Sequence, residues 1–253
     1  MITVLSLGWG VQSFTIAAMV ALGELQPITA AIHADTTHER TATYNFARQW
    51  TPWLEQHGVK VITVHANNTD DVTRPDRPTP IPAFTTRPNG TPSGLLRRQC
   101  TTNWKIRPIR QWLQANRNKQ PVTMWIGISL DEIERIRPSD VRYITNAWPL
   151  TDLKMTRNDC INWLTHHNLP IPPRSACVFC PYQSITDWQH LHESAGNDWK
   201  HAIEIDNAIR HKKPGYVAYL TYHRKPLADI EQFKQHKHQP PLFTDECTGH
   251  CFL

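Results

Sequence analysis

The sequence lacks any long hydrophobic run. Its longest apolar stretches, such as residues 14–22, are far shorter than the roughly 20 residues that a membrane-spanning helix needs. The first residues, MITVLSL, contain no basic region and no cleavage site of the kind that an export signal has. No internal repeat is visible. We therefore expect a soluble, cytoplasmic protein without a membrane partner.

The sequence also has no strong excess of one charge. Lysine and arginine number 27 and aspartate and glutamate 22, which gives a formal net charge of +5. This mildly basic balance suits an anionic ligand or nucleic acid, but many enzymes with neither partner share it. At 253 residues the chain can form one large domain or a core domain with a smaller appendage, and we expect the second arrangement.

The first 150 residues alternate between strand-like and helix-like segments. We expect strands at residues 2–7, 28–34, 60–66 and 122–128, and helices at residues 12–25, 41–58 and 105–116. This alternation predicts an α/β domain over residues 1–150, with a parallel sheet and helices on both faces. Residues 151–253 are predicted to form a helical, cysteine-rich extension packed on that domain. The proline-rich residues 75–92 predict a long surface loop, and residues 215–227 a hairpin or an irregular segment.

A glycine-containing turn, GWGVQS, joins the first strand to the first helix at residues 8–13. Such a turn can present backbone N–H groups and a helix N-terminus to a phosphate. A Walker-type loop needs a lysine before its Ser or Thr, and Gln12 stands there instead. A dinucleotide-binding turn fits two of the glycines and Asp35, which would hold the ribose, but Ser13 replaces the third glycine. Trp9 could stack on a base or clamp the turn, and a turn that only links strand and helix is a further alternative.

The same turn resembles the pyrophosphatase loop (PP-loop) of the adenine-nucleotide α-hydrolase superfamily, Ser-Gly-Gly-x-Asp-Ser, with Gln12 in place of the acid. Four further segments resemble the phosphoadenosine phosphosulfate (PAPS) reductase family: ADTTHE at 34–39, RQCTTNWKIRPI at 98–109, SACVFCPY at 175–182 and ECTGHC at 246–251. The resemblance spans nearly the whole chain and implies a Rossmann-like fold of the PP-loop ATP pyrophosphatase type. It also implies an adenine-nucleotide site formed by Ser6, Gly8, Gly10, Gln12, Ser13, Asp35, Arg98, Gly127 and Arg135. For Asp35 the alternative is an N-cap of the following helix.

The six cysteines do not suggest a disulfide framework in a cytoplasmic chain. Cys160 is expected in the core, because a lone cysteine in an amphipathic helix is usually a small buried hydrophobe. The resemblance implies a 4Fe-4S cluster, with the ligands Cys100, Cys177, Cys180 and Cys251. Cys247 could replace Cys251, or the fourth ligand could be missing. The alternatives are a structural zinc site made from two cysteine pairs, and free or redox-active thiols.

Charged side chains gather in two further stretches. Asp131, Glu132 and Arg135 follow the fourth strand. The acids could bind magnesium or orient the arginine so that it touches a phosphate, or Asp131 and Arg135 could form an ordinary i,i+4 ion pair. Lys105 belongs to a basic group near Cys100 that would hold phosphate or sulfate and keep the thiolate ionised. A solvated helix face is the alternative for this group.

Two reactions follow from the resemblance. In the first, ATP binds with magnesium, an acceptor nucleic acid or nucleotide is adenylated, and sulfur is inserted; a donor such as a cysteine desulfurase or thioredoxin would supply the sulfur. In the second, PAPS or adenosine phosphosulfate (APS) is reduced, and the Cys247 thiolate attacks the sulfate sulfur so that sulfite is released. We favour sulfur transfer, with Cys247, Asp131 and Lys105 as the expected catalytic residues. A non-catalytic nucleotide-binding or nucleic-acid-binding protein with a structural metal is a third alternative.

Overall fold

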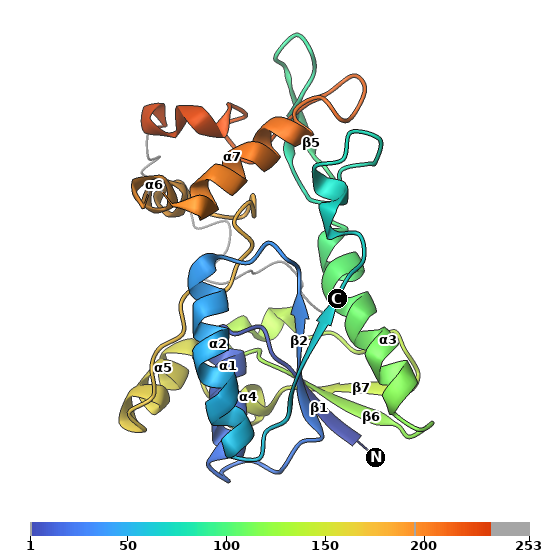
Figure 1. Ribbon diagram of the computed structural model, residues 1–253, viewed down its shortest axis with the longest axis vertical. Coiled ribbons are helices and arrows are strands. Elements are labelled where there is room, and N and C mark those ends of the chain that lie inside the picture. Colours follow the sequence, from blue (N-terminus) through green and yellow to red (C-terminus); the bar gives the residue numbers. More distant parts are fainter. Residues whose placement is uncertain (1, 195, 234–253) are drawn as a thin grey trace.

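The computed structural model describes residues 2–194 and 196–233, and its centre is a five-stranded parallel sheet (Figure 1). The strand order is β3-β2-β1-β6-β7. The strands are β1 (Ile2–Ser6), β2 (Ala30–Asp35), β3 (Val61–His65), β6 (Val122–Ile126) and β7 (Ile144–Ala147). Ser6 pairs with Ile32 on one side and with Ile126 on the other, so β1, β2 and β6 end at the same edge of the sheet.

Helices cover both faces of this sheet. One face, which includes Leu5 and Ala31, packs against α1 (Val11–Ala21), α2 (Thr41–Gln56) and α5 (Arg157–His166). The opposite face, which includes Val4 and Ile32, packs against α3 (Arg107–Asn116). The inner strands β1, β2 and β6 are largely buried between these layers, which explains why their sequences are mostly apolar. The predicted α/β class, with a parallel sheet between helices, is therefore confirmed.

A second group of elements surrounds a small antiparallel sheet with the order β5-β4-β8. Its strands are β4 (Phe84–Thr86), β5 (Pro92–Leu95) and β8 (Val217–Tyr219). The prediction of one long loop over residues 75–92 is wrong, because β4 lies inside it and β5 begins at its end. Prolines are tolerated there because β5 is an edge strand and Pro92 is its first residue. β7 was not expected either.

The C-terminal part of the described chain is helical, as predicted. In addition to α5 it contains α6 (Ile185–Glu193) and α7 (Asn197–Ile209). Short helices also occur along the whole described chain: η1 (Thr69–Val72), η2 (Thr101–Ile106), η3 (Leu130–Arg135), α4 (Pro149–Asp152) and η4 (Leu227–Gln232). Capping boxes at Thr156 and Ser184 start α5 and α6. In residues 2–194 and 196–233, no helix combines the length and the apolar character that crossing a bilayer requires.

Side-chain packing links segments that are distant in the sequence. Residues 160–164 of α5 belong to the cluster under α1 and α2, whereas residues 72–104 share a core with residues 178–233. The division of the chain at residue 150 stays a prediction. Cys247 and Cys251 lie outside the described residues.

Candidate functional site: a cleft at the ends of the parallel strands

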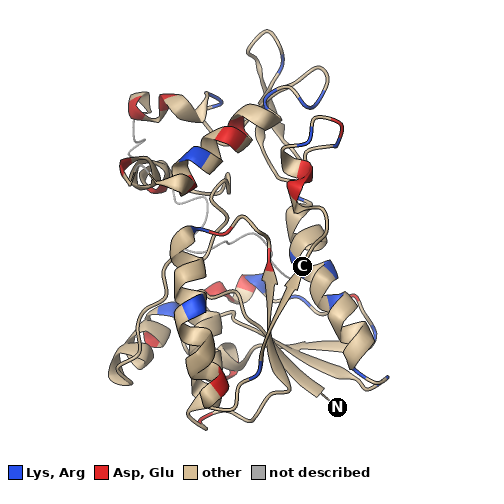
Figure 2. Cartoon of the chain, viewed as in Figure 1, with Lys and Arg blue, Asp and Glu red and all other residues tan. Residues whose placement is uncertain are grey.

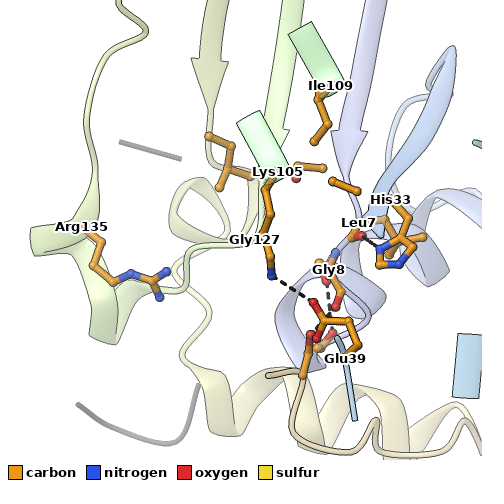
Figure 3. A pocket seen from close by; sticks show the side chains of 14 residues that line it. Leu7, Gly8, His33, Glu39, Lys105, Ile109, Gly127 and Arg135 are labelled. Carbon is orange, nitrogen blue, oxygen red and sulfur yellow. Dashed lines mark hydrogen bonds and ion pairs between the residues drawn. The ribbon is translucent and has the colours of Figure 1, made fainter. Parts of the chain in front are cut away.

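A cleft opens at the carboxyl ends of β1, β2 and β6 (Figure 3). This edge is where ligands bind in open parallel sheets. Seven of the residues that the sequence singled out line the cleft: Ser6, Gly8, Gly10, Ser13, Lys105, Gly127 and Arg135. The structure therefore brings most of the predicted nucleotide site together.

The glycine-containing turn holds the N-terminus of α1 against this cleft. Gly10 is the N-cap residue, no side chain caps the helix, and the first turn of α1 contains no acidic residue. The backbone N–H of Gly8 donates to Ser13 Oγ at 3.2 Å, and Ser13 Oγ lies 3.3 Å from the Gly10 carbonyl oxygen, to which it donates. A helix N-terminus without an acidic cap favours an anion, because its N–H groups and dipole are directed at the ligand.

Trp9 clamps the turn from the core side. Its side chain is 1% exposed and packs against Phe14, His33 and Phe46, with ring centroids 6.3 to 6.4 Å away. Its φ of 60° is uncommon for a residue other than glycine. The burial of the indole keeps this backbone conformation in place, and it rules out the alternative in which Trp9 stacks on a bound base.

Gly127 is required by packing between β6 and the turn. A Cβ atom at this position would lie 2.8 Å from the Ser13 backbone nitrogen and 3.0 Å from Ser13 Cα. Since both contacts are with backbone, no side-chain rotation could relieve them. Gly127 lines the cleft, but the main reason for a glycine here is that α1 packs closely against the end of β6.

Gln12 does not line the cleft, although it was predicted to bind the nucleotide. Its side chain is completely buried, and Nε2 donates to Glu132 Oε2 at 3.1 Å and to Ser129 Oγ at 3.4 Å. Glu132 also pairs with Arg135, at 2.6 Å between Oε1 and Nη1. Burial raises the pKa of Glu132, and the positive charge of Arg135 opposes this shift. Gln12 thus holds η3, and through it Arg135, at the rim of the cleft.

The acid of the predicted Asp131–Arg135 ion pair has another partner. Asp131 Oδ1 accepts a hydrogen bond from the Arg157 backbone N–H at 3.0 Å, and Asp131 does not line the cleft. Arg135 is paired with Glu132, three residues before it, so the i,i+4 alternative is wrong.

Asp35 also lies outside the cleft lining, at the end of β2. It accepts hydrogen bonds from the Thr37 N–H and from the Tyr44 hydroxyl, each at 2.7 Å, and it lies 3.5 Å from His65 Nδ1. Burial, followed by the bond to Asp35, raises the pKa of Tyr44. The N-cap of α2 is Arg40, so the alternative role of Asp35 as that N-cap is wrong.

An ion pair between Lys105 and Glu39 crosses the cleft. Lys105 Nζ lies 3.2 Å from Glu39 Oε1, and the Glu39 side chain is only 1% exposed (Figure 3). The second oxygen, Oε2, is buried and has no hydrogen-bond partner within the described part of the chain. Glu39 was not predicted as a site residue, although the segment ADTTHE that contains it was singled out. Its partner lies far away in the sequence, so only the fold reveals the pair.

His33 and Ser175 line the cleft and were not predicted either. His33 Nδ1 donates to the Leu7 carbonyl oxygen at 3.1 Å, and burial lowers the pKa of the imidazole. The neutral ring then carries no proton on Nε2, which can accept a hydrogen bond. Ser175 Oγ donates to the Gly8 carbonyl oxygen and so ties the segment SACVFC to the turn.

A second cavity contains the three described candidate metal ligands. Cys100, Cys177 and Cys180 line it together with Arg98 and Lys105. Arg98 lies here, 5.5 Å above the Tyr182 ring centroid, and does not line the nucleotide cleft. Cys160 is completely buried among core residues under α1, as expected.

Cys177 lies beside the buried carboxylate of Glu39. Its Sγ lies 3.4 Å from Thr36 Oγ1 and 4.0 Å from Glu39 Oε1. Burial, followed by the negative charge of Glu39, raises the pKa of the Cys177 thiol. Within residues 2–194 and 196–233, no three Cys, His, Asp or Glu side chains are grouped so that they could hold a metal ion. These residues do not form a preassembled metal centre, and an iron–sulfur cluster or a zinc ion stays a prediction.

Comparison with known proteins gives limited information. No family model and no curated protein matches the sequence. Among solved structures, a PAPS reductase from Candida auris in complex with phosphate is similar over 68% of this chain and 75% of its own, with a TM-score of 0.44 and 11% identity. This likeness is too low to assign a family or an activity. The fold therefore rests on the strand order and the helices described above.

Proposed function

We propose that the protein is an enzyme that binds an adenine nucleotide in the cleft and performs sulfur chemistry in the adjoining cysteine cavity. The observation that carries this proposal is that Lys105 lines both spaces. One ammonium group thus lines both the cleft at the N-terminus of α1 and the cavity that contains three thiols. The specific activity we propose is that of an ATP-dependent sulfurtransferase of the PP-loop type, as the sequence resemblance implies.

The cleft offers suitable chemistry for a nucleoside triphosphate. The N-terminus of α1 and Ser13 would contact phosphate oxygens, and Arg135 and Lys105 would balance their charge. Ile109 and Ile126 provide an apolar wall for a base. Magnesium, when bound with ATP, would screen the phosphates further.

The proposed reaction has two stages. An oxygen of the acceptor attacks the α-phosphorus, and the bond to pyrophosphate breaks. A sulfur nucleophile then attacks the acceptor carbon that carries the adenylated oxygen. The carbon–oxygen bond breaks, and AMP leaves with that oxygen. The cavity lined by Cys100, Cys177 and Cys180 is the proposed place of the second stage, because it adjoins the cleft at Lys105. Cys247 and a separate sulfur donor belong to the same proposal.

The test is a comparison of nucleotide binding and products in the wild type and in a double variant, Lys105→Gln with Glu39→Gln. Both members of the buried pair are neutralised, so no charge is left unpaired. The expected result is an ATP dissociation constant raised about 10- to 100-fold, which corresponds to the loss of a charged hydrogen bond to phosphate. The control is Lys60→Gln, an exposed lysine before β3, which should bind ATP like the wild type.

The products decide between the reactions. Pyrophosphate release from ATP, dependent on an acceptor, supports sulfur transfer. Sulfite release from PAPS or APS without pyrophosphate release from ATP would replace it with sulfonucleotide reduction. Nucleotide binding without either product would support a non-catalytic protein. No binding of ATP, PAPS or APS at millimolar concentration would refute the proposal as a whole.

A further inference from the structure

The charges of this chain are strongly segregated along the sequence. Residues 77–130 contain nine Lys or Arg and no Asp or Glu, and residues 207–228 contain five Lys or Arg and no Asp or Glu. These two segments therefore carry a formal charge of +14, whereas the rest of the chain carries −9. The small net charge of +5 hides this separation. A strongly basic segment is the electrostatic footprint of a polyanion partner.

The fold joins parts of the two acid-free segments in the small antiparallel sheet, whereas residues 101–130 of the first segment form η2, α3 and β6 beside or within the parallel sheet. Residues 77–130 supply β4 and β5, and residues 207–228 supply β8, which pairs with β4. In Figure 2 the loops around β5 carry Lys and Arg, whereas the acidic positions of this half of the molecule lie mainly on helices. The sheet is thus a basic surface made from parts that are far apart in the sequence.

Several cations of this surface are exposed and form no ion pair within the described residues. Arg87, Arg97, Lys213 and Lys225 are exposed, and none of them lies within ion-pair distance of an acidic side chain in the described residues. Some other Lys and Arg residues of the two segments have structural roles. Arg210, for example, pairs with the buried carboxylate of Asp206. The four exposed side chains are therefore available to a ligand.

Aromatic rings accompany these cations. Lys213 Nζ lies 4.4 Å from the centroid of the Tyr216 ring, and the pairing of Thr86 with Val217 brings Arg87 to the same end of the sheet. The guanidinium of Arg224 lies 5.7 Å from the centroid of the Phe84 ring. Cations interleaved with aromatic rings bind single-stranded nucleic acid, because they neutralise phosphates and stack on bases.

The opposite end of β4 and β5 leads to the cysteine cavity. The Leu96 N–H donates to the Ala83 carbonyl oxygen at 2.8 Å, and Arg98, two residues further on, lines the cavity. Pro82, which precedes β4, lines it as well. The basic surface and the thiols are therefore continuous.

We infer that the β5-β4-β8 sheet is a docking surface for a single-stranded nucleic acid, whose reacting nucleotide enters the cysteine cavity. This inference names the acceptor of the proposed sulfur transfer and rests on that function for its catalytic part. The docking itself depends only on the charges and rings of the sheet.

The experiment is a fluorescence-anisotropy titration of the full chain with a labelled 20-nucleotide single-stranded RNA of mixed sequence, over a range of salt concentrations. The surface variant combines Arg87→Gln, Arg97→Gln, Lys213→Gln and Lys225→Gln. The control variant removes the same charge from exposed residues elsewhere: Arg48→Gln, Lys60→Gln, Arg142→Gln and Lys154→Gln. Single-stranded and duplex DNA, heparin and polyglutamate are titrated in parallel.

The surface variant is expected to bind RNA about 10- to 100-fold more weakly at 0.1 M salt, with a salt dependence shallower by about 3 in the log–log slope. The control variant should lose much less than this. Equal losses in the two variants, or wild-type binding to polyglutamate or heparin as tight as to the single strand, would overturn the inference. Tighter binding to duplex DNA would overturn the single-strand assignment.

ATP titrations of the same preparations separate the two proposals. The surface variant should bind ATP like the wild type, because none of its four residues lines the cleft. Failure of the wild type to bind any nucleotide would remove the proposed function and leave the RNA result standing. Normal ATP binding with no RNA binding would remove the docking surface alone.

Discussion

Replacing Gln12 by glutamate should severely destabilise the fold, even though the new side chain has nearly the same shape. Gln12 is completely buried, and its Nε2 donates to Glu132 Oε2 at 3.1 Å. Its other polar atom, Oε1, is buried without a hydrogen-bond partner in the described residues. The substitution would replace a donor by an acceptor and place a second carboxylate beside that of Glu132.

The magnitude follows from this geometry. The bond from Gln12 to the carboxylate of Glu132 is worth about 1.5–3 kcal/mol, and a buried charge left without a partner costs about 3–5 kcal/mol. Arg135 already pairs with Glu132, so one guanidinium would face two carboxylates. We expect Gln12→Glu to lower the free energy of unfolding by about 3–5 kcal/mol at pH 8.

The loss of stability caused by Gln12→Glu should depend on pH, and the direction of this dependence can be predicted. The introduced carboxylate would have a pKa raised above its value in the unfolded chain, as burial already raises that of Glu132. A raised pKa contributes stability at low pH that is lost as the pH rises through the folded value. The loss caused by Gln12→Glu should therefore be smaller at pH 5.5 than at pH 8.

Urea unfolding followed by tryptophan fluorescence measures both effects. The exchange variant, Gln12→Glu with Glu132→Gln, restores an amide opposite a carboxylate and should recover most of the lost stability. A decrease in the free energy of unfolding of less than about 1 kcal/mol at pH 8, or the same decrease at both pH values, would refute the reasoning, because two buried carboxylates destabilise a fold by more than this.

Two further predictions concern the turn and the buried histidines. Gly127→Ala should lower the free energy of unfolding by about 1–3 kcal/mol in urea titrations, because the new Cβ would lie 2.8 Å from the Ser13 backbone nitrogen. In the control variant Gly8→Ala the new Cβ would lie 3.8 Å from Ser13 Oγ, and the free energy of unfolding should change by less than about 0.5 kcal/mol. Equal losses in the two variants would contradict this prediction. His33 and His38 have pKa values lowered by burial from 6.5, so the stability they contribute is present above pH 6.5 and is lost as the pH falls through the folded values. Each adds at most about 1.36 kcal/mol per pH unit to the slope, and the double variant with Gln at both positions should unfold with a flatter dependence between pH 7 and 5.5.

The parallel sheet could be predicted because its strands are short apolar runs between amphipathic helices. β7 was missed because its sequence, ITNA, contains two polar residues, as an edge strand tolerates. β4 and β5 were missed because proline dominates the surrounding segment. β4 also pairs with β8, which lies about 130 residues later, so no local pattern marks that part of the sheet.

Many residues that line the cleft could be predicted, but not the direction of each side chain. The positions that contribute backbone atoms to the cleft, such as Gly8 and Gly10, can be predicted from the order of strand, turn and helix. The direction of a side chain depends on distant contacts, and Gln12 turns inward because Glu132 lies opposite it in the fold. Glu39 escaped prediction for the same reason, since its partner Lys105 comes from another element.

The residues of the turn therefore divide into two kinds. Gly8, Gly10 and Ser13 face the cleft, whereas Trp9 and Gln12 face the core and fix the turn against it. A phosphate site needs both kinds, because backbone N–H groups bind an anion well only when they are already oriented before it arrives. Of the three departures of this turn from the PP-loop pattern, Trp9 and Gln12 thus lie on the core side, where they support the loop, and only Gly8, in place of a serine, faces the cleft in which we propose that a phosphate binds.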